Sequence, residues 1–212
     1  VPTFRDAQTG YWAQFRPEDM ATEAGFRAHP QRVWDWYQYR RDLLADALPI
    51  AGHLALAAFQ QQFPGRLTLI TQNVDGLHQR AGSTGVLCLH GDIFEDRWLD
   101  MPRNCCHIEH AVAGHPPYCD RCGNLLRPGV VWFGEALPFR TLEAAQQAAQ
   151  ACDLMLVVGT AGAVYPAAGL AHQARAAGAK VVVLNPAPSA LDGTAHAVLR
   201  APAAQVLPPL LG

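Results

Sequence analysis

Residues 71–82 read TQNVDGLHQRAG, and the short apolar run 67–70, Leu-Thr-Leu-Ile, stands directly before them. Such a run is typical of a buried parallel strand. Asn73 and Asp75 follow at its carboxyl end, which is where an open α/β sheet places its ligand site. The stretch therefore predicts a parallel sheet with a polar site at its edge. The alternative is a plain polar turn before a capped helix.

The elements around this stretch alternate in a way that predicts a doubly wound parallel α/β sheet. We expect helices over 32–48, 53–63, 141–152 and 167–177, and strands over 67–70, 86–89, 154–158 and 180–184. The order of strand, loop, helix and strand is typical of βαβ units. Residues 93–127 are rich in Cys, His and Pro and lack periodicity, which indicates an inserted module. We predict a Rossmann-like domain formed by 1–15, 48–92 and 128–212, and a smaller helical and zinc-ribbon-like module formed by 16–47 and 93–127.

The composition is that of an ordinary globular protein. Half of the 212 residues are hydrophobic, 16% are charged, and the net charge is −2. These values argue against disorder and give no electrostatic footprint for a nucleic acid or an anionic membrane. No apolar run approaches the roughly 20 residues that span a bilayer, and the residues from Val1 onward lack a signal-peptide layout. We expect a monomeric cytoplasmic protein.

Four of the six cysteines lie close together, at Cys105, Cys106, Cys119 and Cys122. Clustering without a secretory signal favours metal binding over disulfides, and two residues between Cys119 and Cys122 let both sulfurs reach one zinc ion. Adjacent cysteines rarely turn both sulfurs to one metal. One of the first pair with a nearby histidine, His107 or His110, is therefore an alternative, and free thiols in a loop are another.

Three weaker signals accompany these. Gly159 and Thr160 follow a strand and precede a helix, so their amides could hold a phosphate or a ribose hydroxyl, although a tight turn explains them equally. His90 follows a strand and fits a general base, or a turn residue. Tyr37 and Arg40 share one helix face and could bind a carboxylate together. The alternative is a packed tyrosine beside a solvated arginine.

Taken together, six motifs in order resemble the sirtuins, which are NAD-dependent protein lysine deacylases. The motifs are Pro2–Ala7 (PTFRDA), Thr71–His78 (TQNVDGLH), Leu89–Gly91 (LHG), Leu125–Pro128 (LLRP), Val131–Glu135 (VWFGE) and Val158–Thr160 (VGT). Within that family, the run WYQYRR at 36–41 resembles the branch whose tyrosine and arginine favour succinyl and malonyl groups. The resemblance thus favours a carboxylate-binding role for Tyr37 and Arg40.

The resemblance implies a reaction between NAD and an acylated lysine. The acyl oxygen attacks the ribose carbon that carries nicotinamide, and His90, with Asn73 beside it, then deprotonates a ribose hydroxyl. A histidine suits this step because its ordinary pKa near 6.5 leaves it mostly neutral at cellular pH. The products are free lysine, nicotinamide and an O-acyl-ADP-ribose.

The resemblance also assigns the binding residues. NAD contacts fall on Phe4, Arg5, Gln72, Asn73, Val74, Asp75, Gly159, Thr160, Ala161, Asn185, Pro186 and Ala203. Substrate contacts fall on Ala21, Tyr37, Arg40, Val131, Trp132, Phe133, Gly134 and Glu135, where the last five form a strand that pairs with the peptide. A structural zinc ion falls on Cys105, Cys106, Cys119 and Cys122.

The chain departs from the family pattern at three places. The glycine-rich segment Gly-Ala-Gly-x-Ser-x-x-Ser-Gly should stand directly before Val1, so we expect either an upstream extension or a poor NAD binder. Trp98 and Met101 occupy the positions of the first zinc-ligand pair, and Ala161 replaces a frequent serine. We predict a desuccinylase and demalonylase with weaker deacetylase activity. The alternatives are a plain deacetylase and a catalytically impaired module that binds acyl-lysine peptides.

Overall fold

The computed structural model describes residues 14–212, apart from the side chains of Pro17 and Glu18. These residues form two compact units. Unit 1 comprises the described residues 14–47 together with Asn73–Gly76 and His90–Ala136, and unit 2 comprises Leu48–Gln72, Leu77–Leu89 and Leu137–Gly212. This division differs from the expected domains, because the described residues 14–15, 73–76, 90–92 and 128–136 belong to unit 1. The assignment of functions to two domains stays a prediction.

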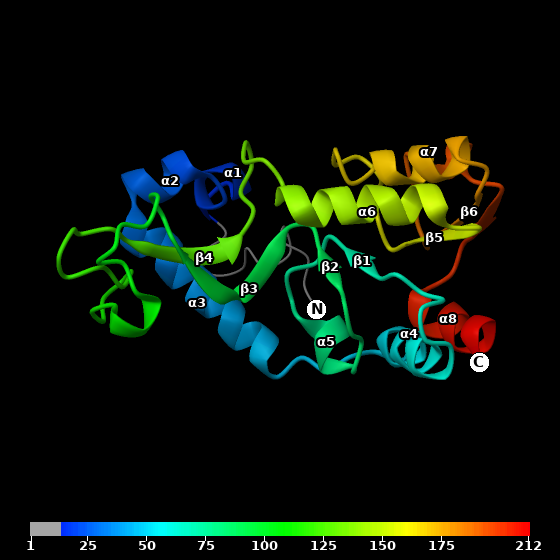
Figure 1. Cartoon of the computed structure of the whole chain (residues 1–212), viewed down its shortest axis with the longest axis horizontal. Helices are drawn as coiled ribbons and strands as arrows, with labels where there is room; N and C mark the ends of the chain where they lie inside the picture. Colours follow the sequence, from blue (N-terminus) through cyan, green and yellow to red (C-terminus); the bar gives the residue numbers. More distant parts are fainter. Residues whose placement is uncertain (1–13) are drawn as a thin grey trace. The chain divides into compact units, whose positions relative to one another are not determined.

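Unit 1 combines three helices with one antiparallel pair of strands (Figure 1). The helices are α1 (Pro17–Met20), α2 (Glu23–Ala28) and α3 (Pro30–Ala45), and the 3-10 helix η2 spans Ile108–His110. Thr22 caps α2, since its hydroxyl accepts a hydrogen bond from the Gly25 amide at 3.1 Å. The strands β3 (Gly91–Trp98) and β4 (Leu126–Val130) pair in a register that joins Trp98 to Leu126, with an irregularity between Gly91 and Asp96.

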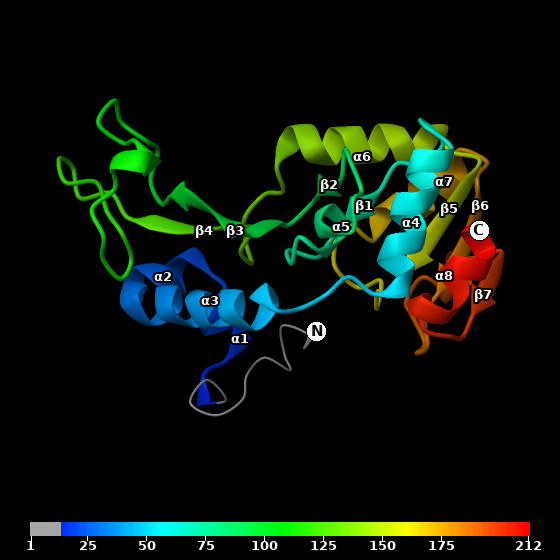
Figure 2. The same cartoon turned by 90° about the horizontal axis from the view of Figure 1, so that it is seen from below.

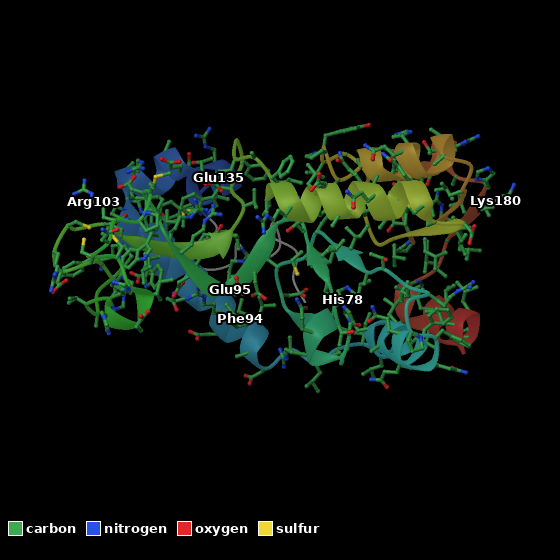
Figure 3. All side chains as sticks on the ribbon, viewed as in Figure 1. His78, Phe94, Glu95, Arg103, Glu135 and Lys180 are labelled. Atoms are coloured by element: carbon green, nitrogen blue, oxygen red, sulfur yellow. The ribbon has the colours of Figure 1, made fainter. Side chains whose placement is uncertain are left out.

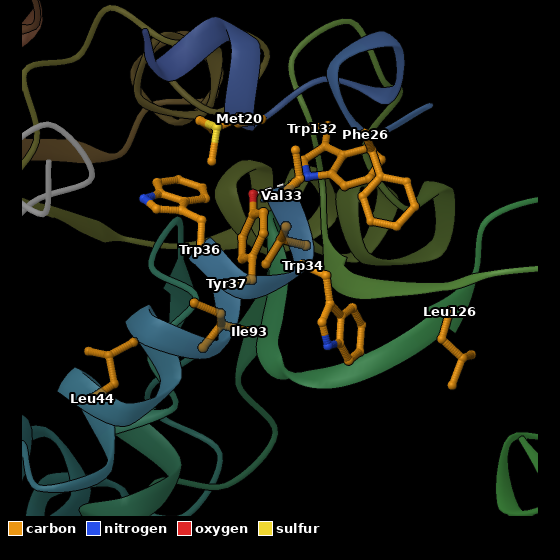
Figure 4. Close-up of a cluster of buried hydrophobic side chains, with 12 residues drawn as sticks. Met20, Phe26, Val33, Trp34, Trp36, Tyr37, Leu44, Ile93, Leu126 and Trp132 are labelled. Atoms are coloured by element: carbon orange, nitrogen blue, oxygen red, sulfur yellow. Dashed lines mark hydrogen bonds between the residues drawn. The ribbon is translucent and has the colours of Figure 1, made fainter. Parts of the chain in front are cut away.

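The core of unit 1 is dominated by large aromatic side chains (Figure 4). Helix α3, expected over 32–48, begins two residues earlier and turns Val33, Trp36, Tyr37 and Leu44 inward. This spacing of three, four and seven residues is that of one helix face. Phe26 of α2, Ile93 of β3 and Leu126 of β4 complete the same cluster. Helix α3 is thereby held against the strand pair that leads into residues 131–135.

Unit 2 contains the parallel strands. The strands β1 (Ile70–Thr71) and β2 (Leu87–Cys88) pair with each other. The strands β5 (Leu154–Val158), β6 (Lys180–Leu184) and β7 (Ala197–Leu199) form a second parallel sheet in the order β5-β6-β7. The helices are α4 (Ala51–Gln62), α5 (Leu77–Arg80), α6 (Phe139–Ala151), α7 (Gly169–Ala176) and α8 (Ala203–Leu211), and η3 spans Asp192–Thr194.

Helices cover both faces of these strands (Figures 1 and 2). Val181 and Val183 of β6 pack in one core with alanines and leucines of α6 and α7. Leu184 packs in another core with Leu56 of α4 and Leu207 of α8. Because successive side chains of a strand point to opposite faces, residues of β6 serve two cores. The predicted doubly wound α/β fold is therefore confirmed.

Several elements differ from the expectations. Of the first apolar run at 67–70, only Ile70 belongs to a paired strand, which continues to Thr71, while the strands at 154–158 and 180–184 have the expected bounds. The strand β3 lies where we expected no regular structure, and α8 contains Pro208 and Pro209. Within the part of the chain described above, no helix has the length and hydropathy needed to cross a bilayer.

Candidate functional site

The polar loop Asn73–Gly76 lies against the start of β3. The carbonyl of Val74 accepts a hydrogen bond from the Ile93 amide at 2.9 Å, and the carbonyl of His90 accepts one from the Val131 amide at 2.8 Å. Backbone hydrogen bonds of unit 1 therefore connect three sets of predicted site residues. They are the loop predicted to hold the nicotinamide end of NAD, the predicted base His90, and the segment predicted to contact substrate. Gln72 belongs to unit 2. Phe4 and Arg5 lie outside the described residues.

Gly91 allows the chain to turn directly after His90. Its φ is +80°, and a Cβ at this position would lie 2.0 Å from the carbonyl oxygen of Gly129 in β4. A side chain at Gly91 would thus meet both a strained backbone conformation and a rigid backbone atom. The position of His90 depends on this close approach between the two strands.

We expect Gly91→Ala to lower the free energy of unfolding of unit 1 by at least about 3 kcal/mol, because backbone strain and a clash add together. Gly134→Ala is the matched control, since Gly134 has φ +86° with nothing within 4 Å of the added Cβ. The control should lose only the 1–2 kcal/mol or so of left-handed strain. Denaturant unfolding followed by tryptophan fluorescence measures both variants. Equal losses would contradict the close-approach argument.

Residues 131–135 do not form the strand that we expected, since β4 ends at Val130. Their amides turn inward instead. Val131 donates to the His90 carbonyl, Trp132 donates to the Glu135 carboxylate at 2.7 Å, and Phe133 donates to the Ala21 carbonyl at 2.9 Å. These three donors are already used inside unit 1, so a peptide cannot pair with them without breaking a bond. Contact between this segment and a substrate stays a prediction.

An ion pair between a buried arginine and a partly buried glutamate holds this segment in place. Arg127 of β4 is 2% exposed, bonds to the Glu135 carboxylate and donates to the Val130 carbonyl at 2.7 Å. Glu135 also accepts from Arg97 of β3 at 2.8 Å, and it lies just beyond β4 (Figure 3). Burial raises the pKa of the Glu135 carboxyl, but the hydrogen bonds from Arg127 and the Trp132 amide outweigh burial and lower the pKa overall. The sequence assigned no role to Arg127, because its partner is visible only in three dimensions.

Tyr37 and Arg40 lie together on α3, as their spacing predicts. The Arg40 guanidinium carbon lies 5.6 Å from the centre of the Tyr37 ring and 5.0 Å from that of Trp36. The Tyr37 hydroxyl accepts a hydrogen bond from the Trp132 indole at 3.0 Å. Burial raises the pKa of Tyr37 and lowers the pKa of Arg40. Tyr37 is packed in the core as the plainer interpretation expected, but Arg40 is half-buried rather than solvated.

The four clustered cysteines meet at one point of unit 1. Their sulfur atoms lie within 4.8 Å of one another, and those of Cys106 and Cys122 are 3.4 Å apart. Four ligands about 2.3 Å from a tetrahedral zinc ion would be about 3.8 Å apart, so the set fits structural zinc. Both neighbouring cysteines, Cys105 and Cys106, face the same point, whereas His107 bonds to the Asn104 carbonyl at 3.0 Å. The arrangement favours the four-cysteine set over the alternative with a histidine.

The backbone of the Cys119–Cys122 turn prepares the cluster for a cation. Burial raises the pKa of the Cys119 thiol, but the Arg121 and Cys122 amides that point at its sulfur outweigh burial and lower the pKa to about 7. The turn itself closes through a 2.8 Å bond from the Gly123 amide to the Cys119 carbonyl. A thiolate is the form that zinc binds, so Cys119 is the cysteine of this turn that most readily supplies it. At the Cys122 thiol a backbone hydrogen bond lowers the pKa, but burial and the neighbouring cysteines outweigh it and raise the pKa to about 12.

We expect Cys119→Ser to abolish stoichiometric zinc binding and to lower the melting temperature of unit 1, because a structural zinc site contributes directly to folding. Metal analysis of the purified protein and thermal unfolding measure the two effects. Cys152→Ser serves as the control, since Cys152 ends α6 in unit 2. Equal zinc content in the parent and in the Cys119 variant would refute the four-cysteine site.

The turn after β5 in unit 2 is built by its own polar groups. The Gly159 amide donates to the Leu184 carbonyl at 2.9 Å, and Gly159 has φ +64°. The Thr160 hydroxyl accepts from the Gly162 amide at 3.1 Å. The buried Asn185 amide donates to the Thr160 carbonyl at 3.3 Å and ties this turn to the loop after β6. Gly159, Thr160 and Asn185 are thus brought together as predicted, but the Gly159 amide is already occupied.

The remaining expected residues are placed as follows. Ala161 belongs to the same turn, where its carbonyl accepts from the Ala190 amide at 2.9 Å. Pro186 follows Asn185 in the loop after β6, and Ala203 is the first residue of α8 and packs in the core with Leu184. Ala21 is buried in unit 1. The contacts of these residues with NAD or an acyl group stay predictions.

Comparison with known proteins identifies the family. The profile of the Sir2 family matches residues 1–166. An NAD-dependent protein deacylase of Ralstonia nicotianae is 55% identical over 211 residues, which cover 100% of this chain and 85% of the relative. A solved Sir2 homologue in complex with NAD is 39% identical with a TM-score of 0.87, covering 100% of this chain and 82% of that one. A solved Sir2 protein bound to an acetylated peptide is 28% identical with a TM-score of 0.82, covering 93% and 83%. The chain therefore belongs to the Sir2 family.

Proposed function

We propose that the protein is an NAD-dependent protein-lysine deacylase that removes succinyl and malonyl groups, and acetyl groups more weakly. Family membership and the relatives named NAD-dependent protein deacylase support the reaction class. The Sir2 structures with NAD and with acylated peptides support the two substrates. The acyl preference rests on one observation, which is that the Arg40 guanidinium carbon lies 5.6 Å from the centre of the Tyr37 ring on helix α3.

A carboxylate at the end of the acyl chain is the ligand that suits both the Arg40 guanidinium and the Tyr37 hydroxyl. The guanidinium of Arg40 supplies a charge and a fork of donors, and the Tyr37 hydroxyl supplies one more donor. Burial of Arg40 means that a bound carboxylate would be partly shielded from water, which strengthens its attraction to the guanidinium. An acetyl group has no carboxylate and would gain nothing from either residue.

The reaction assigns distinct tasks to the residues of unit 1. NAD supplies the ribose carbon that receives the acyl oxygen as nicotinamide leaves. His90 takes a proton from a ribose hydroxyl, and Asn73 and Asp75 orient that end of the dinucleotide. The turn at Gly91 and the hydrogen bond from the Val131 amide to the His90 carbonyl hold the backbone of His90 in place. The cysteine cluster stabilises the module that carries residues 91–135 and takes no part in proton transfer.

Peptides of one sequence that carry succinyl-, malonyl- or acetyl-lysine test the proposal directly. We expect NAD-dependent loss of all three groups, with kcat/KM higher for the two acidic groups than for acetyl. Equal values for acetyl and succinyl peptides would leave a plain deacetylase. Binding of acylated peptide without any turnover would point to a module that only captures acyl-lysine.

A further inference from the structure

The indole of Trp132 is held on two sides. Its side chain is 2% exposed, its ring centre lies 5.3 Å from that of Phe26, and the Arg127 guanidinium carbon lies 3.2 Å from its ring centroid. Arg127 is in turn fixed by Glu135 and by the Val130 carbonyl. The indole therefore has little freedom to rotate. Its N–H group points at the Tyr37 hydroxyl, 3.0 Å away (Figure 4).

The direction of this hydrogen bond is set by chemistry. An indole nitrogen can only donate, so the Tyr37 oxygen must be the acceptor. The hydroxyl hydrogen of Tyr37 is then directed to a different acceptor. A hydroxyl that accepts one hydrogen bond also becomes a better donor in the next. Trp132 thus decides both where the Tyr37 hydrogen points and how strongly it donates.

We propose that Trp132 is a positioning residue for acyl selection, whose indole N–H orients the Tyr37 hydroxyl so that it donates to the carboxylate of a succinyl or malonyl group. This inference rests on the proposed function and adds a residue to it. The role is separate from any backbone contact between residues 131–135 and a peptide. It also gives a role to the Arg127–Glu135 pair, because this pair restricts rotation of the indole that orients Tyr37.

A purely structural role is the competing explanation, because a buried indole N–H needs a hydrogen-bond acceptor in any core. The two explanations differ in what removal of the N–H should do. A structural role predicts the same change for every acyl group. An orienting role predicts a change only for groups that carry a carboxylate.

The test uses Trp132→Phe, Tyr37→Phe and the double variant with succinyl and acetyl peptides of one sequence. Trp132→Phe retains a ring between Phe26 and Arg127 but has no N–H. We expect the ratio of its KM for the succinyl peptide to its KM for the acetyl peptide to rise about 5- to 10-fold over the parent, which corresponds to one hydrogen bond. In the Tyr37→Phe background, Trp132→Phe should raise the succinyl KM no further, since no hydroxyl remains to be oriented.

Replacement of Trp132 by benzothienylalanine provides a second variant, in which sulfur replaces the N–H and the ring shape is unchanged. It should reproduce the succinyl-specific rise even if the phenylalanine variant folds poorly. Phe26→Leu is the packing control, since it loosens the same core and leaves the indole N–H intact. Its effects on the two peptides should be equal.

The outcomes distinguish failure of the proposed acyl preference from failure of the positioning role of Trp132. If Tyr37→Phe itself fails to distinguish succinyl from acetyl peptides, the proposed acyl preference is wrong. If Tyr37→Phe distinguishes them but the Trp132 variants change both peptides alike, the positioning role is overturned. Full additivity of Trp132→Phe and Tyr37→Phe on the succinyl KM would overturn it as well.

Discussion

Replacement of His90 by alanine is expected to lower the rate of NAD-dependent deacylation about 10²- to 10⁴-fold, which is the usual contribution of a positioned general base. The loss should appear in kcat for succinyl and acetyl peptides alike, because the proton that His90 removes belongs to the ribose in both reactions. Product formation under saturating peptide and NAD measures it.

The exchange of labelled nicotinamide into NAD provides the internal control for His90→Ala. Nicotinamide leaves before the base acts, so exchange should persist in the variant while deacylation is lost. The melting temperature should also stay near that of the parent, since Gly91 and the His90 backbone are unchanged. Loss of exchange together with deacylation would mean that His90 acts in binding rather than as the base.

Arg40→Met is expected to lower kcat/KM for the succinyl peptide about 10- to 150-fold and to leave the acetyl value within about twofold. The size follows from a hydrogen bond to a charged group, worth about 1.5–3 kcal/mol. Tyr37→Phe should act in the same direction with a loss towards the lower end of this range, because it removes a neutral donor. Steady-state kinetics with matched peptides measure both variants.

Tyr39→Phe is the matched control for these variants, since Tyr39 lies on α3 two residues from Tyr37. It should change neither peptide's kcat/KM by more than about twofold. Arg40→Lys should fall between the parent and Arg40→Met, because lysine keeps the charge but lacks the planar fork. Equal losses on succinyl and acetyl peptides in Arg40→Met would contradict the carboxylate-binding role.

Much of unit 2 is predictable from the sequence because its strands are short apolar runs between helices. The runs at 154–158 and 180–184 are parallel strands, and their hydropathy alone predicts them. The helix α3 is predictable for a similar reason, since its apolar residues return at the helical period. The spacing of Tyr37 and Arg40 on that helix also places them together without knowledge of the fold.

Other parts could not be predicted, for reasons that are equally physical. The strand β3 carries Asp92, Glu95 and Asp96, which hide its alternation, and α8 contains two prolines that argue against a helix. The Arg127–Glu135 pair and the Trp132–Tyr37 bond join residues from separate elements. Local pattern carries no information about such contacts. The resemblance assigned residues 131–135 to a strand that pairs with a peptide, whereas β4 ends at Val130 and the amides of Val131, Trp132 and Phe133 bond inside unit 1.

Mass-spectrometric identification of the small-molecule product tests the central claim most directly. The protein is incubated with NAD and a succinyl-lysine peptide, with an acetyl-lysine peptide of the same sequence in parallel. We predict O-succinyl-ADP-ribose together with nicotinamide and the free-lysine peptide, formed with higher kcat/KM than the O-acetyl product. Release of free succinate while NAD stays intact, or formation of the acetyl product alone, would contradict the account.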